Sequence, residues 1–278
     1  MPHFYEYEMV RASVERGISL LGGTDRFVKR GEKILLKPNM LAGDRPEKCV
    51  TTHPAVFRAV GERFIEAGAI VSYGDSPAVA KPARAARKAG FAEAAQTLNI
   101  QPADFDTGVD YYFDRGLQKR KFTIARAVFD NDGVVSLPKL KTHGLEKFTG
   151  AVKNQLGTVP GMLKGEYHFK LPDADDFAKM LVDLNTVVSP RLYVMDGIEA
   201  MEGNGPRGGT PKKMGVLLFA SDPVAMDAVA CRLIGLDPEH VPTIRYGMEA
   251  GMGTFLLCTI MTTASSASAA RRSARNMP

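Results

Sequence analysis

The feature that most constrains the fold is a regular alternation of short apolar runs with longer segments of helical periodicity. The apolar runs span residues 33–37, 69–73, 134–138, 192–196 and 215–220, and the helical segments span 54–68, 79–89, 173–188 and 222–235. Apolar runs of this length are typical of buried strands, and strands that alternate with helices form mostly parallel sheets. We therefore predict an α/β fold with a Rossmann-like three-layer arrangement: a mostly parallel sheet with helices on both faces.

The length and composition of the chain fit one globular domain. Its 278 residues are 45% hydrophobic and 24% charged, which is ordinary for a globular protein. We predict that residues 1–257 form a single α/β domain. Residues 258–278 are small, polar and basic without apolar periodicity, so we predict that they are disordered, and they resemble a foreign or frame-shifted end. The sequence leaves the oligomeric state open.

Charge and hydropathy argue against two classes of partner. Three of the 36 Lys and Arg residues lie after residue 258, so the rest of the chain carries 33 basic against 31 acidic side chains. This near balance, without a basic stripe rich in aromatics, argues against nucleic acid. No apolar run reaches the ~18 residues that a membrane span needs, and the N-terminus does not resemble a secretory signal. We expect a cytoplasmic protein with neither nucleic acid nor membrane as a partner.

Polar side chains follow five of the predicted strands, and in open α/β sheets ligands bind outside the carboxyl ends of the strands. The candidate ligand-binding residues are Lys37, Asn39, Asp75, Ser76, Lys139, Lys141, Thr142, Asn154, Asp196, Asn204 and Asp227. Several have a purely structural alternative. Ser76 is also a suitable helix cap, Lys139 and Lys141 could be solvated, and Asp227, inside an apolar helical pattern, could form a structural hydrogen bond.

The segment 137–157, LPKLKTHGLEKFTGAVKNQLG, gathers four lysines and His143 around a single acid, Glu146. Its first half alternates like a strand, and its second half is predicted to be a helix ending at Gly157. His143, Lys153 and His168 are the candidate catalytic residues, since imidazole moves protons or binds metals and a desolvated lysine acts as base or covalent anchor. On one straight helix, residues 143 and 153 would lie about 15 Å apart, so the backbone near Gly150 must be irregular if both serve one site.

In order, the motifs LLKPN, TTHP, GDSP, LPKLKTH with TGAVKNQLG, MDGIEAMEGNGP and DPVAMDAVA resemble the family called domain of unknown function 362, over residues 30–253. The resemblance implies the α/β fold and a redox neighbourhood, because many members carry a ferredoxin-like module with two four-iron clusters. This chain departs from that pattern. Cys49, Cys231 and Cys258 contain no CxxC, so its cysteines alone do not encode an iron–sulfur cluster.

A shorter resemblance concerns the order His143, Gly150, Lys153, Pro160-Gly161 and His168, which is similar to the H…GGRK…PG…H order of the lactate racemase family. It implies that Lys153 would carry a nickel-pincer nucleotide and that His168 would ligate the nickel. The interval from lysine to Pro-Gly is longer here than in that family. The family's other catalytic histidine has no matched position, and His53 is the nearest candidate.

These observations predict a polar cleft that binds a small anionic metabolite or a phosphate-bearing cofactor. The cofactor itself is unknown; a divalent metal is one that His143 and His168 could ligate. If the protein is an enzyme, His143, Lys153 and His168 would carry its chemistry. The alternative is a non-catalytic redox-partner protein, whose basic rim at Lys119, Arg120 and Lys121 docks an acidic ferredoxin-like protein. Inward-pointing lysines would favour the ligand site.

Overall fold

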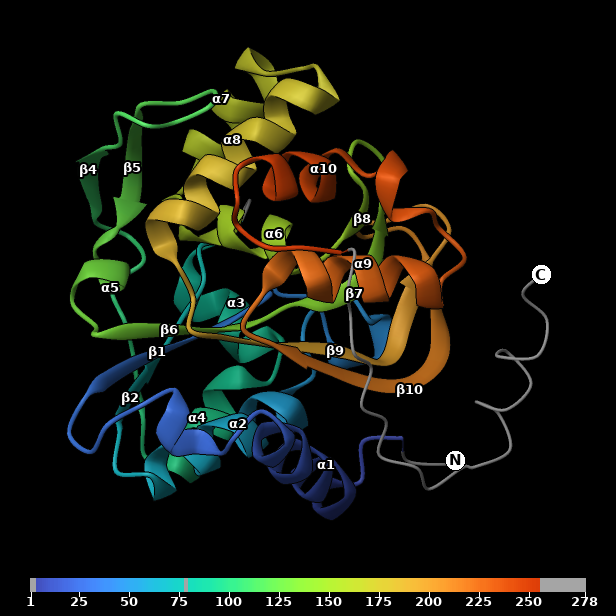
Figure 1. The fold of residues 1–278 in the computed structure, drawn as a ribbon. Coiled ribbons are helices and arrows are strands. Elements are labelled where there is room, and N and C mark those ends of the chain that lie inside the picture. Colours follow the sequence, from blue (N-terminus) through green and yellow to red (C-terminus); the bar gives the residue numbers. More distant parts are fainter. Residues whose placement is uncertain (1–3, 78–79, 256–278) are drawn as a thin grey trace.

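The structure, a computed structural model, describes residues 4–77 and 80–255 (Figure 1). Its centre is an eight-stranded sheet in the order β3-β2-β1-β6-β9-β7-β8, with β10 paired to β9. The strands are β1 (Lys33–Pro38), β2 (Ile70–Tyr73), β3 (Gln101–Pro102), β6 (Gly133–Leu137), β7 (Lys139–His143), β8 (Lys147–Thr149), β9 (Leu192–Glu202) and β10 (Thr210–Ala220). Five strand pairs are parallel, whereas β7–β8 and β9–β10 are antiparallel. The predicted mostly parallel sheet is confirmed.

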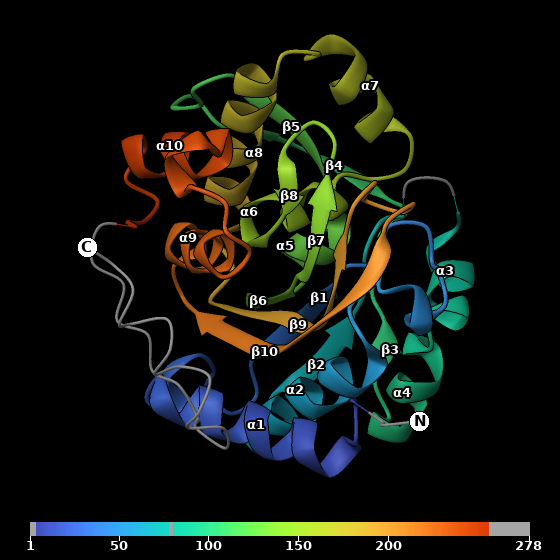
Figure 2. The same ribbon diagram turned by 90° about the vertical axis from the view of Figure 1, so that its right-hand side faces the viewer.

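Helices cover both faces of this sheet (Figures 1 and 2). On one face lie α1 (Tyr7–Leu20), α2 (Pro54–Glu66), α3 (Pro82–Lys88) and α4 (Phe91–Leu98); on the other lie α6 (Ala151–Asn154), α8 (Ala174–Val188), α9 (Pro223–Leu233) and α10 (Pro242–Glu249). At the margin of the second face are α5 (Arg126–Phe129), α7 (Leu163–Lys170) and a separate hairpin of β4 (Gly108–Tyr112) and β5 (Lys121–Ala125). Short 3₁₀ turns span Thr24–Arg26, Pro46–Lys48, Gln155–Thr158 and Pro238–His240. The α/β prediction is therefore confirmed.

The alternation of side chains along β1 shows why both faces are covered. Ile34 and Leu36 lie in the apolar core against α1, α2 and α4, whereas Leu35 lies in a second core around α8. Successive strand residues point to opposite faces, so a continuously apolar strand needs a helical layer on each side. All three side chains are fully buried.

Two helix starts follow from their caps. The side chain of Asp173 accepts the N–H groups of Asp175 and Asp176 at the start of α8. Asp222 accepts the N–H of Ala225 at the start of α9, where Pro223 occupies the first turn. Such side chains satisfy N–H groups that a helix start leaves free. Both helices begin at the predicted positions.

One local prediction is wrong, and two elements differ in length from the prediction. The second half of segment 137–157 does not form one helix: after β7 the chain turns into the antiparallel strand β8, and only then begins the four-residue α6. The strand predicted at 192–196 is longer, because β9 continues to Glu202 and pairs with β10. In place of the predicted helix 79–89 stands α3, from Pro82 to Lys88.

The predicted disordered tail, 258–278, lies outside the described residues, which end at residue 255. Among the residues that the structure does describe, no helix combines the length and apolar character that crossing a bilayer requires.

Candidate functional site

Two of the predicted lysines are buried in ion pairs at the carboxyl ends of the strands. The Lys37 Nζ atom lies 2.8 Å from Asp75 Oδ1, and the N–H of Met40 donates to the other carboxylate oxygen at 2.8 Å. Gly157 passes directly over this pair: a Cβ atom there would overlap Asp75 Oδ1 and lie 2.7 Å from Lys37 Nζ. Burial lowers the pKa of Lys37, and the Asp75 carboxylate opposes that effect. The pair neutralises itself at the end of β1.

The second pair joins Lys139 to Asp196, with Nζ and Oδ2 2.8 Å apart. The Tyr5 hydroxyl donates to Asp196 Oδ1 at 2.9 Å and accepts from Lys139 at 3.0 Å, and its ring stacks on His53 at 3.6 Å. The N–H groups of His53 and Ile198 also donate to Asp196. Since both oxygens of Asp196 are occupied, this carboxylate holds the N-terminal segment against the sheet and is poorly placed to bind a divalent ion.

His53, the nearest candidate for a second catalytic histidine, serves as the cap of α2. Its Nδ1 atom accepts the N–H of Ala55 at 3.1 Å. Burial lowers the pKa of His53 to about 4. The ring is thus held neutral between the helix start and Tyr5.

Lys141 is fully buried without an ion pair among the residues that the structure describes. Its Nζ atom donates to Asn39 Oδ1 at 2.6 Å and to the carbonyl oxygen of Val50 at 2.5 Å. Burial, followed by the charges of Lys153 and Lys139, lowers the pKa of Lys141 to about 7. A lysine that lacks a carboxylate partner at this depth favours a bound anion.

An amide network fixes α6 to the sheet beside Lys141. Asn39 Nδ2 donates to Asn154 Oδ1 at 3.0 Å, and Asn154 Nδ2 donates to Ser136 Oγ at 2.9 Å. Gln155 Nε2 donates to the same hydroxyl at 2.8 Å. The side-chain amides of Asn39 and Asn154, predicted to bind a ligand, therefore use some of their hydrogen-bonding groups to hold this short helix.

Asp227 fixes the other end of α6. Its Oδ1 and Oδ2 atoms accept the N–H groups of Ala151 and Val152 at 2.6 and 3.1 Å. Burial raises the pKa of Asp227 to about 7, although both hydrogen bonds oppose the rise. The structural alternative for this acid is thus what the contacts favour: Asp227 positions the helix that carries Lys153.

Lys153 points from α6 into the protein, where its side chain is 9% exposed. Its ammonium group lies 5.3 Å from the centre of the Phe177 ring. No hydrogen bond or ion pair reaches it from residues 4–77 or 80–255. Burial lowers the pKa of Lys153 to about 8, and Glu146 opposes that shift. This is the environment of a lysine that can lose its proton near neutral pH.

The three candidate catalytic residues come together around Lys153. His168, on α7, is exposed at one edge but stacks on Phe177, with ring centroids 4.4 Å apart. Burial and then the Lys153 charge lower the pKa of His168 to about 4 and that of His143 to about 3, with smaller contributions at His143 from His168 and Lys141. The β7–β8 hairpin thus brings residues 143 and 153 close, where one straight helix would separate them.

The tautomer of His143 is set by the turn that follows it. Its Nδ1 atom accepts the N–H groups of Leu145 and Glu146, each at 3.2 Å. The neutral ring therefore carries its proton on Nε2 and can donate there. A metal bound at Nε2 would need the other tautomer and would break both contacts, so the geometry favours a hydrogen-bonding role for His143.

Sequence reasoning missed two residues of this region. Glu146, in the β7–β8 turn, is 1% exposed, and burial raises its pKa to about 7 while Lys153 opposes the rise. Lys164, on α7, donates to the carbonyl oxygens of Ser76 and Pro77, and burial lowers its pKa to about 8. Neither lies directly after a predicted strand, and their burial appears only in the fold.

Three predicted residues lie apart from the Lys141–Lys153 centre. Thr142 alternates with Lys141 and His143 along β7, so it faces the other side of the hairpin, against Gly205. Asn204 is exposed in the 203–209 loop. The Ser76 hydroxyl accepts the N–H of Gly161 at 2.9 Å and does not cap a helix.

Buried polar atoms without a hydrogen-bond partner concentrate between residues 142 and 155. Of the described residues, those from 142 to 155 contribute Thr142 Oγ1, both Glu146 carboxylate oxygens, Thr149 Oγ1 and Gln155 Oε1. Buried polar groups are nearly always hydrogen-bonded, so a local group of exceptions points to an additional partner.

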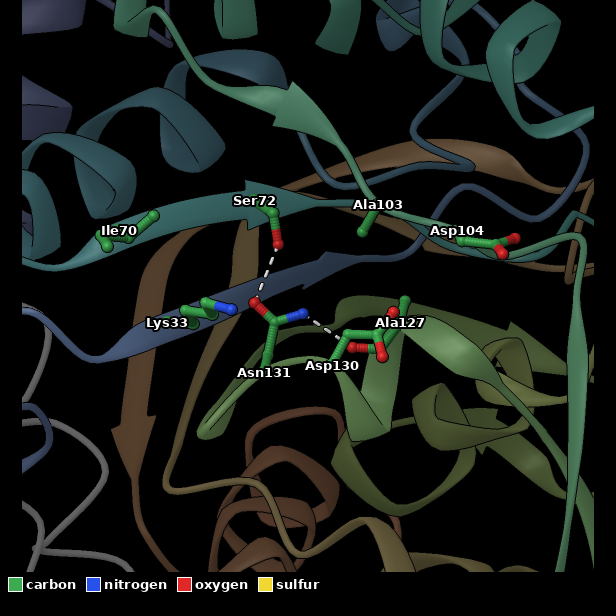
Figure 3. Close-up of a pocket in the computed structure, with 8 residues that line it drawn as sticks. All are labelled: Lys33, Ile70, Ser72, Ala103, Asp104, Ala127, Asp130 and Asn131. Atoms are coloured by element: carbon green, nitrogen blue, oxygen red, sulfur yellow. Dashed lines mark hydrogen bonds between the residues drawn. The ribbon is translucent and has the colours of Figure 1, made fainter.

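Two pockets of the described structure lie away from the buried lysines 37, 139, 141 and 153. A pocket of about 230 Å³ lies near the amino ends of β1 and β2; it is lined by Lys33, Ile70, Ser72, Ala103, Asp104, Ala127, Asp130 and Asn131 (Figure 3). There Asn131 accepts from Ser72 and donates to Ala127, so its amide is already satisfied. A larger pocket of about 500 Å³ lies between α3 and α4. We place the candidate site at the buried lysines instead, because unpaired buried charge demands a partner and an open apolar groove does not.

The profile of the family described as Domain of unknown function (DUF362) matches residues 34–232. The thylakoid-associated protein sll1697 of Synechocystis sp. is 37% identical over 249 residues, which cover 89% of this chain and 77% of that protein.

Among solved structures, the lactate racemase apoprotein from Thermoanaerobacterium thermosaccharolyticum is similar, with a TM-score of 0.52 and 12% identity over 82% of this chain. A Thermotoga maritima protein gives a TM-score of 0.46, also at 12% identity, over 81% of this chain. This chain spans only 55% of the racemase chain and 59% of the Thermotoga chain, and at such identity the racemase likeness shows the fold alone. The family profile and the Synechocystis relative agree with the motif order, and the chain belongs to the DUF362 family.

Proposed function

We propose that the lysines at the carboxyl ends of the strands bind a small anionic metabolite or a phosphate-bearing cofactor. One observation carries this proposal: Lys141 and Lys153 are buried together without a carboxylate bonded to either, in contrast to Lys37 and Lys139. A desolvated ammonium group is costly unless an anion compensates it. Lys37 and Lys139, by contrast, are each neutralised by a carboxylate of the protein itself.

The same arrangement supports proton transfer or covalent attachment. Lys153, whose pKa is lowered to about 8, would act as a base or as a covalent anchor. His143 would donate a hydrogen bond from Nε2, and His168 lies at the exposed edge, where a ligand could enter. Whether the protein is an enzyme depends on whether a bound molecule reacts there.

A metal would need ligands beyond the side chains. Residues 4–77 and 80–255 contain no group of three or more His, Cys, Asp and Glu that could hold an ion. The setting of Lys153 fits the attachment of a nucleotide-type cofactor, which would supply the remaining ligands itself and provide redox or hydride chemistry. His168 is then the more suitable of the two histidines to approach its metal.

The docking alternative has less support in the contacts. Lys119 packs 4.7 Å from the Tyr167 ring, and Lys121 pairs with Asp110 at 2.8 Å. Of the three, only Arg120 is exposed and has no ion pair with an acidic side chain among the described residues. A cytoplasmic location stays a prediction; the name of the Synechocystis relative makes attachment to internal membranes worth testing by fractionation.

The test measures phosphate binding by isothermal titration calorimetry, with intact mass recorded on the same preparation. Lys141→Met and Lys153→Met keep the length of the side chain and remove its charge. We expect each to weaken phosphate binding by at least about tenfold, or ~1.4 kcal/mol. Lys147→Met, exposed on the same hairpin, is the matched control and should retain wild-type affinity. Wild-type affinity in both buried-lysine variants would reject the proposal.

A further inference from the structure

Among the described residues of the candidate site, Glu146 is the acid whose carboxylate has neither a hydrogen bond nor an ion pair. Its side chain is 1% exposed, and neither carboxylate oxygen has a hydrogen-bond partner in the described structure. Other buried acids at this sheet edge are fully engaged: Asp75 with Lys37 and Met40, and Asp196 with Lys139 and Tyr5. Two free acceptor oxygens at this depth are the exception.

The position of Glu146 is fixed by its backbone. Its N–H donates to His143 Nδ1 at 3.2 Å, and its carbonyl oxygen accepts the N–H of Phe148 at 2.6 Å, which closes the β7–β8 turn. Thr149 Oγ1 is also without a partner among the described residues; Thr149 pairs with Lys141 across the hairpin and so shares a face with Lys141 and His143. The unpaired acceptors and the unpaired ammonium of Lys153 therefore belong to one region.

Lys153 does not form an ion pair with the Glu146 carboxylate. The two side chains affect one another electrostatically, yet no direct ion pair forms between them. A purely structural acid would be expected to close that pair, as Asp75 and Asp196 do. The open arrangement leaves the Glu146 carboxylate and the Lys153 ammonium group each available to a third group.

We propose that Glu146 contacts the ligand and selects one that carries a hydrogen-bond donor, hydroxyl or ammonium, close to its anionic group. This inference rests on the proposed function. The anionic group would lie at Lys141 and Lys153, and the donor would lie at the Glu146 carboxylate. A plain anion would leave the carboxylate unpaired, and a buried site built to accept a hydrogen bond rejects ligands that lack the donor.

The test compares three probes that share one phosphate and a two-carbon arm: ethyl phosphate, 2-hydroxyethyl phosphate and 2-aminoethyl phosphate. We expect wild-type protein to bind one of the two donor-bearing probes at least about tenfold more tightly than ethyl phosphate. Preference for the amine identifies an ammonium, and preference for the alcohol identifies a hydroxyl. In Glu146→Leu the preference should disappear while ethyl phosphate binds at least as well. Glu166→Leu, an exposed acid on α7, is the matched control and should keep the preference.

A second readout covers folding. Because Glu146→Leu removes an unpaired buried carboxyl, the unliganded variant should melt at or above the wild-type temperature. If that variant fails to fold, Glu146→Gln preserves the shape and should lose a preference for the amine while keeping one for the alcohol.

The outcomes separate the two levels of the proposal. Equal affinity for all three probes, any preference unchanged in Glu146→Leu, or a preference for the amine unchanged in Glu146→Gln overturns the inference while Lys153-dependent phosphate binding still stands. Failure of every probe to bind wild-type protein overturns the proposed anion site and this inference with it.

Discussion

The Lys37–Asp75 pair depends on the absence of a side chain at Gly157. Gly157→Ala would place a methyl group onto Asp75 Oδ1 and within 2.7 Å of Lys37 Nζ. Both charges are almost fully buried, so neither can move into water. The substitution must therefore separate the pair or displace the 3₁₀ turn that carries residue 157.

The expected loss of stability can be bounded from these contacts. Overpacking a buried site costs about 1–3 kcal/mol, and breaking a buried ion pair costs about 3–5 kcal/mol because an uncompensated charge remains. A shift that relieves the steric overlap also separates the two charges, so the two costs do not add. We therefore expect a loss of about 3–5 kcal/mol. For a chain of this size that corresponds to a fall in Tm of about 10 °C.

Thermal and urea unfolding followed by circular dichroism measure the effect. Gly165→Ala is the control: it lies within α7, nothing lies within 4 Å of the added methyl group, and helix propensity predicts equal or higher stability. A Gly157→Ala protein that melts within about 2 °C of wild type would show that the pair tolerates the methyl group, and the reasoning would be refuted.

Three further predictions concern other parts of the site. Lys141 titrates near 10.5 when unfolded but has a pKa of about 7 when folded, so the unfolded state binds the extra proton and stability rises with pH between these values; Lys141→Met should reduce that slope by up to about 1.4 kcal/mol per pH unit in urea titrations, and an unchanged slope would contradict it. Asp227→Asn leaves one N–H of α6 without a good acceptor and should cost about 1–3 kcal/mol in urea unfolding while weakening phosphate binding; unaltered binding would show that the cap does not position Lys153. Arg207→Ala removes two hydrogen bonds to Asp44, of 2.7 and 3.1 Å; because Arg207 is half exposed we expect only about 1 kcal/mol, but faster proteinase K cleavage in the 203–209 loop, and equal cleavage rates would argue against this anchor.

The sheet edge was predictable because it depends on local signals. Each apolar run was short and ended in a polar residue, so Lys37, Asp75, Lys139 and Asp196 could be assigned to one edge before any contact was known. Their pairing could not be predicted. Which lysine meets which carboxylate depends on the strand order, and that order is set by long-range packing.

The second half of segment 137–157 was predicted wrongly for a specific reason. Phe148, Val152 and Leu156 recur at four-residue intervals, as on a helix, although Phe148 lies in β8 and Val152 in α6. Phe148 enters one core and Val152 and Leu156 enter another, so an interval typical of one helix arises from residues of three different elements. Tyr5 escaped notice because an N-terminal tyrosine gives no local signal of burial.

The attachment of α6 has an evolutionary consequence. A helix of four residues has almost no stability of its own. One carboxylate on α9 holds its first turn, and the amide network holds its other end. Lineages of this family could therefore retune the site through α9 while every lysine stays in place. Libraries built to change the ligand should include Asp227 and its neighbours as well as the residues expected to touch the ligand.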